Sequence, residues 1–245
     1  MSARSTADPP AVLHLEGVTV QVGGSRILYG VSFEVSATGV TALLGRNGVG
    51  KTSTLLAVMG LLPRTGVITF AGERIDTEPT HKVVRRGIGY VPENREVFSE
   101  LTVSENLRLA ERGTGPARYD LVFELFPELD RRSKQIAGTL SGGQQQMLAL
   151  GRVLLAENRL LLIDEPTKGL APNIVQDVTR TLERVAAEVP VLLVEQNLGV
   201  VRRLAGRAVV LNRGQVAHTG DAAEMLADIE LTHRLLGVSG ERGAR

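Results

Sequence analysis

The stretch VTALLGRNGVGKTSTLL, residues 40–56, decides the fold class. Its first five residues have the composition of a buried strand, its middle is a glycine-rich turn, and its end has the composition of a helix. The turn GRNGVGKT satisfies the pattern G-x-x-x-x-G-K-[ST], and a preceding strand and a following helix are the context that this pattern requires. The stretch therefore predicts a phosphate-binding loop in an α/β domain.

A glycine-rich loop of this kind turns backbone N–H groups inward and forms a nest for an anion at a helix N-terminus. We expect Lys51 to reach the outer phosphates and the Thr52 hydroxyl to ligate Mg²⁺. The residues expected around the phosphates are Gly45, Arg46, Asn47, Gly48, Val49, Gly50, Lys51, Thr52 and Ser53. A glycine turn without a ligand is the alternative, and the flanking strand and helix argue against it.

Short runs rich in Val, Ile and Leu alternate with helical segments along the rest of the chain, which is typical of a mostly parallel sheet covered by helices. Eight runs are predicted strands: 13–20, 31–35, 40–45, 67–70, 88–91, 160–164, 191–195 and 208–212. Beyond them, Ile174, Val178, Leu182 and Val185 recur at helical spacing and predict one buried stripe. We expect a single domain over residues 11–237.

Strand signals stop between Pro92 and about Leu150, and this gap predicts a helical insertion over about residues 93–150. Thr102 and Glu105, three residues apart, predict a capping box at the start of one of its helices. The ends of the chain, 1–10 and 238–245, read as flexible tails.

The charges nearly balance, with 28 Lys and Arg against 27 Asp and Glu, and this balance argues against a nucleic-acid partner. The chain has no cysteine, so it has neither disulfides nor thiolate metal sites. Its apolar runs are broken by charge well before the roughly 20 residues that a membrane helix needs. Any membrane role must therefore come through a partner.

The run LLLIDEP predicts a buried strand that carries two carboxylates to its C-terminal end. Ligands of an open α/β sheet bind at that end. We expect Asp164 to hold Mg²⁺ and Glu165 to activate the attacking water as a general base. An acidic pair alone is a weak signal, and the phosphate loop strengthens it.

A second glycine-rich helix start lies in LSGGQ. We call residues 141–144, which are Ser141, Gly142, Gly143 and Gln144, the signature stretch. A hydroxyl and unhindered N–H groups at a helix N-terminus form a second phosphate site. Two phosphate sites on one domain suggest that one of them serves a neighbouring molecule.

With these motifs, in their order and spacing, the chain resembles the ATP-binding cassettes of ABC transporters from about Leu13 to Gly237. The stretches that carry the resemblance are GRNGVGKT, VPEN, LSGGQ, LLLIDEP and VEQN. It implies an ATPase of the P-loop type with an α/β fold, an N-terminal antiparallel β portion and an inserted helical subdomain. It also implies that two cassettes pair head to tail, so that the signature stretch of one closes over the ATP and Mg²⁺ of the other.

Within that family, the chain is similar to cassettes of importers for branched-chain amino acids and for urea or short amides. The stretches DEPTKGLAP and LLVEQN carry this closer likeness. It implies a cassette at the cytoplasmic face of the membrane, with membrane-spanning permeases, an extracytoplasmic solute-binding protein, and a second cassette that is identical or different. Phe98, Leu101 and Val103 are the candidate contacts with a permease.

Four positions depart from the general family pattern. Val22 stands where many cassettes stack an aromatic residue on adenine, and Tyr29 is the nearest substitute, so we expect poor discrimination between ATP and GTP. Glu93 replaces a glutamine, and its carboxylate can still ligate Mg²⁺. Ala171 replaces an aspartate that reaches the partner cassette. Gln196 replaces a histidine at the γ-phosphate and is expected to take part in catalysis beside Lys51 and Glu165.

Two other functions stay open at this point. One is a soluble cassette that works on nucleic acid, although such relatives generally carry long coiled coils or two cassettes in one chain. The other is a degenerate cassette that binds ATP as a clamp without hydrolysing it, which the four departures suggest. The presence of Lys51, Asp164 and Glu165 favours hydrolysis.

Overall fold

The computed structural model describes residues 10–111 and 116–237. The predicted tails lie outside the described residues, except for residue 10. The larger sheet has the strand order β10-β9-β3-β8-β7-β6, in which only β10 is antiparallel to its neighbour. Its strands are β3 (Val40–Leu44), β6 (Ile88–Val91), β7 (Leu160–Asp164), β8 (Val191–Val194), β9 (Ala205–Asn212) and β10 (Gln215–Asp221).

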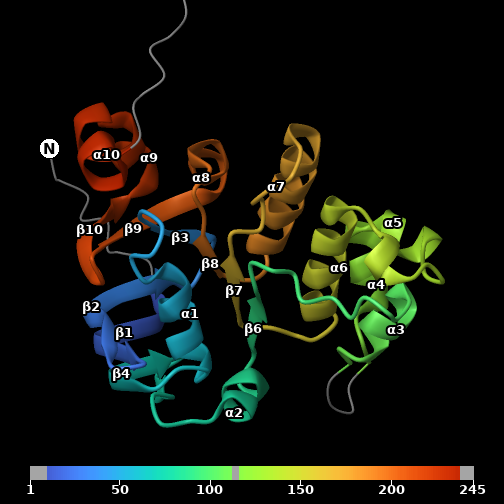
Figure 1. Cartoon of the computed structure of the whole chain (residues 1–245), viewed down its shortest axis with the longest axis horizontal. Helices are drawn as coiled ribbons and strands as arrows, with labels where there is room; N and C mark the ends of the chain where they lie inside the picture. Colours follow the sequence, from blue (N-terminus) through green and yellow to red (C-terminus); the bar gives the residue numbers. More distant parts are fainter. Residues whose placement is uncertain (1–9, 112–115, 238–245) are drawn as a thin grey trace, which may run out of the picture.

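A smaller antiparallel sheet, in the order β2-β1-β4-β5, lies at one end of the molecule (Figure 1). Its strands are β1 (Ala11–Val22), β2 (Ser25–Ser36), β4 (Arg64–Phe70) and β5 (Glu73–Arg74). Its inward side chains share one hydrophobic core with helix α1 and with the larger sheet. The predicted class is confirmed: the fold is that of an α/β P-loop NTPase with an antiparallel β portion at its N-terminal side.

Helices cover the larger sheet and extend beyond it. Near the antiparallel sheet lie α1 (Lys51–Met59) and α2 (Thr80–Arg85), and at the opposite end of the molecule α3 (Val103–Arg108), α4 (Tyr119–Leu125), α5 (Pro127–Arg131) and α6 (Gly142–Leu154) lie together (Figure 1). The remaining helices are α7 (Pro172–Ala186), α8 (Leu198–Leu204), α9 (Ala222–Ala227) and α10 (Ile229–Leu236). A second core joins α3–α7 to the sheet, and a third lies beneath α8–α10.

All eight predicted strands are present, but the prediction missed β5 and β10. Strand β10 lies at the sheet edge, where exposed and half-buried residues alternate without a fully buried one, so its sequence carries no hydrophobic signal. The predicted capping box of Thr102 and Glu105 is confirmed. The predicted stripe is buried at Val178, Leu182 and Val185, whereas Ile174 stays half-buried beside Gly143.

The last helix of the expected insertion is α6. Helix α6 continues to Leu154, so the expected end at about residue 150 falls inside it. Gly151, in the middle of α6, would place a Cβ only 3.1 Å from side-chain atoms of Leu129 and Val122. The glycine thus permits close packing of α6 against its neighbours.

The register of the larger sheet brings the ends of three strands side by side. Val194, the last residue of β8, pairs with Leu43 of β3 on one side and with Asp164 of β7 on the other. Strand β8 therefore separates the strand that leads into the phosphate loop from the strand that ends in the two carboxylates. Whatever follows β8 lies between them.

Candidate functional site

The phosphate loop, residues 45–52, joins β3 to α1. Gly45 has a φ of +145°, and a Cβ at this position would lie 2.4 Å from the Leu211 carbonyl oxygen, so the turn requires glycine. Gly50 caps α1 in the left-handed conformation. The Lys51 side chain is buried, and its Nζ donates to the carbonyls of Gly45 at 2.9 Å and Arg46 at 3.2 Å. The lysine thus lies across the concave face of its own loop.

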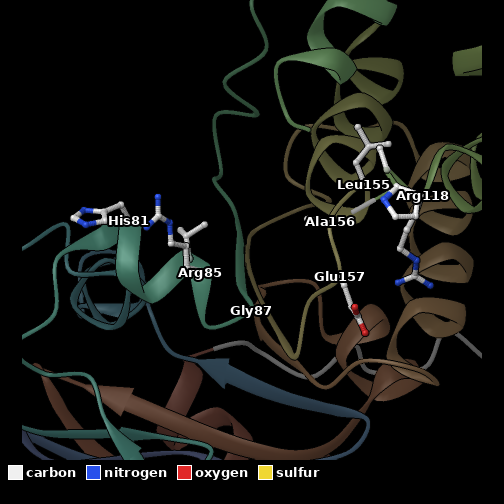
Figure 2. A pocket seen from close by; sticks show the side chains of 10 residues that line it. His81, Arg85, Gly87, Arg118, Leu155, Ala156 and Glu157 are labelled. Atoms are coloured by element: carbon white, nitrogen blue, oxygen red, sulfur yellow. The ribbon is translucent and has the colours of Figure 1, made fainter. Parts of the chain in front are cut away.

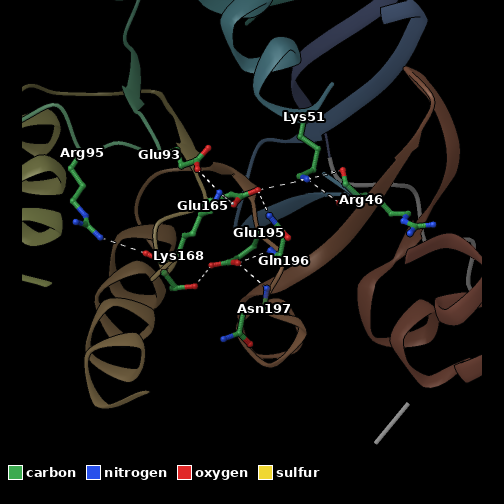
Figure 3. A network of polar contacts seen from close by, with 11 residues as sticks. Arg46, Lys51, Glu93, Arg95, Glu165, Lys168, Glu195, Gln196 and Asn197 are labelled. Atoms are coloured by element: carbon green, nitrogen blue, oxygen red, sulfur yellow. Dashed lines mark hydrogen bonds and ion pairs between the residues drawn. The ribbon is translucent and has the colours of Figure 1, made fainter. Parts of the chain in front are cut away.

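The other predicted phosphate-loop residues lie around this lysine with different exposure. Arg46, Asn47 and Gly48 are exposed, Val49, Thr52 and Ser53 are half-buried, and the two remaining glycines, Gly45 and Gly50, are buried. The Arg46 side chain extends away from Lys51 (Figure 3). Its guanidinium carbon would be 3.6 Å from a Cβ at Gly237, just after α10. The loop therefore presents its backbone, rather than the Arg46 charge, beside Lys51.

Asp164 ends β7 and is fully buried. Neither carboxylate oxygen has a hydrogen-bond partner among the described residues. Burial raises the pKa of this carboxyl to about 6. The nearby Thr52 hydroxyl lowers the pKa, although it does not reach hydrogen-bond geometry, and the negative charge of Glu165 raises the pKa further. An orphaned buried carboxylate costs free energy, and such groups normally find a partner or a metal.

Glu165 follows in a left-handed backbone conformation, with a φ of 45°. Its N–H donates to the Val194 carbonyl at 2.9 Å and thereby fixes the turn to the end of β8. Oε1 of its buried carboxylate accepts from Nε2 of Gln196 at 2.5 Å and lies 3.7 Å from Nζ of Lys51 (Figure 3). The structure thus brings together the three residues that the sequence predicted as catalytic. A side chain held by a strained backbone is a frequent feature of functional sites.

The two neighbours of Gln196 have structural roles that the sequence did not predict. Glu195 is buried, and its carboxylate accepts from the Thr167 hydroxyl and from the backbone N–H groups of Gln196 and Asn197. Asn197 caps α8 by accepting from the N–H groups of residues 199 and 200. These bonds fix the direction in which β8 ends. Gln196, which is exposed, is the member of the triplet that faces the site.

Lys168 is a second residue that sequence reasoning missed. Its ammonium group donates to Oε1 of Glu93, in the loop after β6, and lies 3.4 Å from Oε2 of Glu165. Glu93 is thereby joined to Glu165 through a lysine three positions after Glu165. The only signal in the sequence was the spacing within DEPTKGLAP, since residues three apart in one turn can meet.

Mg²⁺ takes oxygen ligands, usually one or two carboxylates together with substrate phosphates and waters. The predicted ligands, Thr52, Asp164 and Glu93, supply one hydroxyl and two carboxylates, and the orphaned oxygens of Asp164 are suited to a cation. In the part of the chain that the structure describes, no three His, Asp or Glu residues gather into a metal site. The donor set fits an ion that arrives with a phosphate-bearing substrate.

The signature stretch lies at the start of α6. Ser141 accepts from the Gln144 N–H, and the Gln144 side chain accepts from the Ser141 N–H, which completes a capping box. A Cβ on Gly143 would lie 2.5 Å from Ile174, so this glycine also permits close packing against α7. Among the described residues no hydrogen bond or ion pair joins the stretch to the phosphate loop.

One expectation about the rim of the site changes. Tyr29 is no substitute for an aromatic residue at Val22, because the bulge and alternation of the β1–β2 pair place the two side chains on opposite faces. The Tyr29 ring instead lies under the Arg26 guanidinium, at 5.7 Å. Ala171 is the N-cap residue of α7 and has no side chain that could cap it.

A cavity of about 1170 Å³ lies elsewhere, between α2 and the segments 116–118 and 155–157 (Figure 2). His81 and Arg85 line one wall, and Arg118 and Glu157 line the other. None of the predicted site residues lines it. The cluster around Glu165 therefore remains the candidate site on its chemistry.

Together, the phosphate loop, the buried carboxylates at the strand ends and the signature helix define the ATPase class of P-loop proteins. A family profile described as ABC transporter matches residues 28–168, more than half of the chain. The chain belongs to this family of ATP-hydrolysing cassettes. No helix of the described residues is long and apolar enough to cross a membrane.

Relatives support this assignment, and a solved structure shares the fold. The branched-chain amino acid transport ATP-binding protein BraG of Pseudomonas aeruginosa is 40% identical, with 92% of this chain and 100% of BraG covered. The probable counterpart LivF of Archaeoglobus fulgidus is 35% identical (86% and 93% covered), and the lipopolysaccharide export protein LptB of Escherichia coli is 30% identical (93% and 98%). A nucleotide-free ATP-binding cassette has the same fold, with a TM-score of 0.80 at 23% identity (92% and 97%).

Proposed function

We propose that this chain is the ATP-hydrolysing subunit of an importer for branched-chain amino acids. The arrangement that supports hydrolysis is the contact of Glu165 with both Lys51 and Gln196 at the ends of neighbouring strands. The likeness to BraG and LivF supports the solute. The match to LptB, an export protein, is weaker in identity.

In the proposed mechanism, the backbone nest and Lys51 bind the β and γ phosphates, and Lys51 exchanges its present carbonyl acceptors for phosphate oxygens. Thr52, Asp164 and Glu93 would hold Mg²⁺, which supplies charge neutralisation to the phosphates. Release of Lys51 from the loop frees Oε1 of Glu165 for the attacking water. Glu165 accepts the proton of that water, and its position is set by the turn bonded to Val194.

Gln196 has two roles in this proposal. Its amide N–H group now donates to Glu165 and can turn to a γ-phosphate oxygen when the nucleotide is present. Because an amide does not titrate near neutral pH, Gln196 positions groups and does not shuttle protons. Glu165 is then the only general base.

We propose that the signature stretch closes over the ATP of a second cassette and that permease subunits bind near the loop after β6, at the cytoplasmic face of the membrane. Phe98 is 48% exposed and Leu109 is 61% exposed, and both are available to a partner. A cavity of about 250 Å³ lies beside them, lined by Leu109, Arg95 and Arg152. Val103, one of the predicted contacts, is fully buried and is excluded from this surface.

The test uses Glu165→Gln in the full chain. The variant should bind ATP with unchanged affinity and lose hydrolysis, because the amide cannot accept the proton. Hydrolysis at the wild-type rate would remove Glu165 from this role. If the wild-type chain binds ATP but does not hydrolyse it, the result would instead support the degenerate cassette that binds ATP as a clamp.

The solute is tested in cells that lack this chain. Uptake of labelled leucine, isoleucine and valine should fall, should return with the wild-type chain, and should not return with Glu165→Gln. Loss of urea or short-amide uptake, with leucine uptake intact, would replace the proposed solute by the alternative. A solute-binding protein is then sought as the component that binds the same amino acids.

A further inference from the structure

Two loops of the site are joined by basic side chains that point in opposite directions. The Lys168 side chain, from the loop after β7, donates to Glu93 in the loop after β6. In return, Nη2 of Arg95 lies 3.5 Å from the Lys168 carbonyl oxygen. We call Glu93, Arg95 and Lys168 the cross-loop clasp, and Figure 3 shows it beside Glu165.

The cross-loop clasp pairs the negative charge of Glu93 with the positive charge of Lys168. Glu93 places a carboxylate in a site that already contains the carboxylates of Asp164 and Glu165 and that is built for an anionic ligand. The Lys168 ammonium forms ion pairs with the carboxylates of both Glu93 and Glu165. The lysine therefore offsets the negative charge of Glu93.

The two oxygens of Glu165 have separate partners. Oε1 faces Lys51 and Gln196, whereas Oε2 faces Lys168 at 3.4 Å. In the proposed mechanism Lys51 moves to the phosphates, and Lys168 then remains as the cation that holds Glu165. The lysine lies on the same turn as Glu165, and its own backbone N–H donates to the Glu165 carbonyl at 3.1 Å.

We propose that Lys168 is a positioning residue of the nucleotide site, which neutralises Glu93 and holds Oε2 of Glu165. This inference rests on the proposed function of Glu165. Two consequences for the nucleotide site can be tested separately. The affinity for the anionic nucleotide depends on Lys168 through Glu93, and the rate of hydrolysis depends on Lys168 through Glu165.

The test is a double-mutant cycle in the full chain with Glu93→Gln, Lys168→Gln and the double variant. Lys168→Gln leaves one uncompensated carboxylate, so ATP affinity, measured at equilibrium with and without Mg²⁺, should fall about fivefold, the upper range for a partly exposed pair. The double variant has the net charge of the wild type and, in the measurement without Mg²⁺, where Glu93 does not act as a metal ligand, should recover to within about twofold of wild-type affinity. Unchanged affinity in Lys168→Gln, or no recovery in the double variant, would overturn the first consequence.

The rate separates the second consequence from the first. The kcat of ATP hydrolysis should fall about fivefold in Lys168→Gln and stay low in the double variant, because Oε2 of Glu165 has lost its partner in both. Lys168→Arg should keep both affinity and kcat within about twofold, since the guanidinium retains the charge. A wild-type kcat in Lys168→Gln would overturn the role toward Glu165.

Two controls distinguish the causes of failure. Lys134→Gln removes the charge of another exposed lysine outside the site and should change neither quantity, and the thermal midpoint of each variant shows whether the fold is intact. If Glu165→Gln still hydrolyses ATP, the proposed function fails, whatever Lys168 does. If Glu165→Gln is inactive and Lys168→Gln equals the wild type, only the role of Lys168 fails.

Discussion

The phosphate loop and the signature stretch are both glycine-rich helix starts, yet their surroundings differ. The phosphate loop has Lys51 buried beside Glu165, and Gln196 contacts the same carboxylate. The signature stretch satisfies two of its own polar groups through the Ser141 and Gln144 capping box. The N–H groups of Gly142 and Gly143, at the first turn, have no intrahelical partner by position. The catalytic side chains of the first region contact one another within the chain, whereas the second region leaves two N–H groups open to solvent or to a ligand.

The largest expected effect comes from Lys51→Ala, which removes the buried lysine of the phosphate loop. The variant loses the side-chain charge that would bind two phosphates and leaves the buried Glu165 without its nearest buried cation. ATP affinity should fall by at least about a hundredfold, since charged hydrogen bonds contribute about 1.5–3 kcal/mol each. Equilibrium binding of ATP measures this, and wild-type affinity would show that the loop is not the phosphate site.

Gln196→Ala removes the amide that donates to Oε1 of Glu165 and leaves the phosphate loop intact. Loss of one hydrogen bond to a charged group costs about 1.5–3 kcal/mol, or about one to two decades in kcat. ATP affinity should change much less, because the loop and Lys51 remain. Gln196→His should retain activity through an imidazole N–H donor, with a new pH dependence near about 6.5.

Both variants are compared by steady-state hydrolysis with saturating ATP. Equal rates in the wild type and in Gln196→Ala would reduce Gln196 to a polar residue at the end of β8. The catalytic site would then consist of the phosphate loop and the carboxylates of Asp164 and Glu165 alone.

Asp164→Asn tests the free-energy cost of the orphaned carboxylate. The folded pKa of Asp164, about 6, lies above its ordinary value of 3.8, so the carboxyl destabilises the fold as pH rises between these values. The asparagine variant should therefore gain about 1–3 kcal/mol in free energy of unfolding near pH 7, and the gain should vanish below about pH 4. Denaturant unfolding at several pH values measures it, and a pH-independent difference would contradict this assignment.

The smallest expected effect concerns the nucleobase at the rim of the loop. The wild type should hydrolyse GTP at a rate comparable to that of ATP, because Val22 offers no ring and Tyr29 lies on the other face. Val22→Tyr should tighten ATP binding by about 1 kcal/mol, the lower end for base stacking. Titration with both nucleotides decides, and a GTP rate far below the ATP rate would refute the expectation of poor discrimination.

The sequence was most informative where one motif contains all the necessary parts. The phosphate loop needs only its own glycines, lysine and flanking strand and helix, so residues 45–52 could be placed from their order alone. The approach of Gln196 to Glu165 needed the sheet order, in which β8 lies between β3 and β7. That order is set by packing across the whole domain and is not written in a local pattern.

Other features depend on contacts between distant loops. Lys168 meets Glu93 across 75 positions, and the Thr167 hydroxyl meets the buried Glu195 across 28. A charged residue in a polar loop reads as solvated surface unless the partner loop is placed. Gly143 likewise reads as part of a phosphate site, whereas its tight packing against Ile174 appears only in three dimensions.

The central claim is that the two glycine-rich regions serve the nucleotides of different molecules. Gly142→Asp tests it most directly, because an acidic residue in the first turn favours the helix, where Arg95 can pair with it, and repels a phosphate. ATP affinity of the full chain should stay within about twofold of wild type, since its own loop is unchanged, while hydrolysis should fall about a hundredfold. A loss of affinity as large as that of Lys51→Ala, or hydrolysis at the wild-type rate, would contradict the claim.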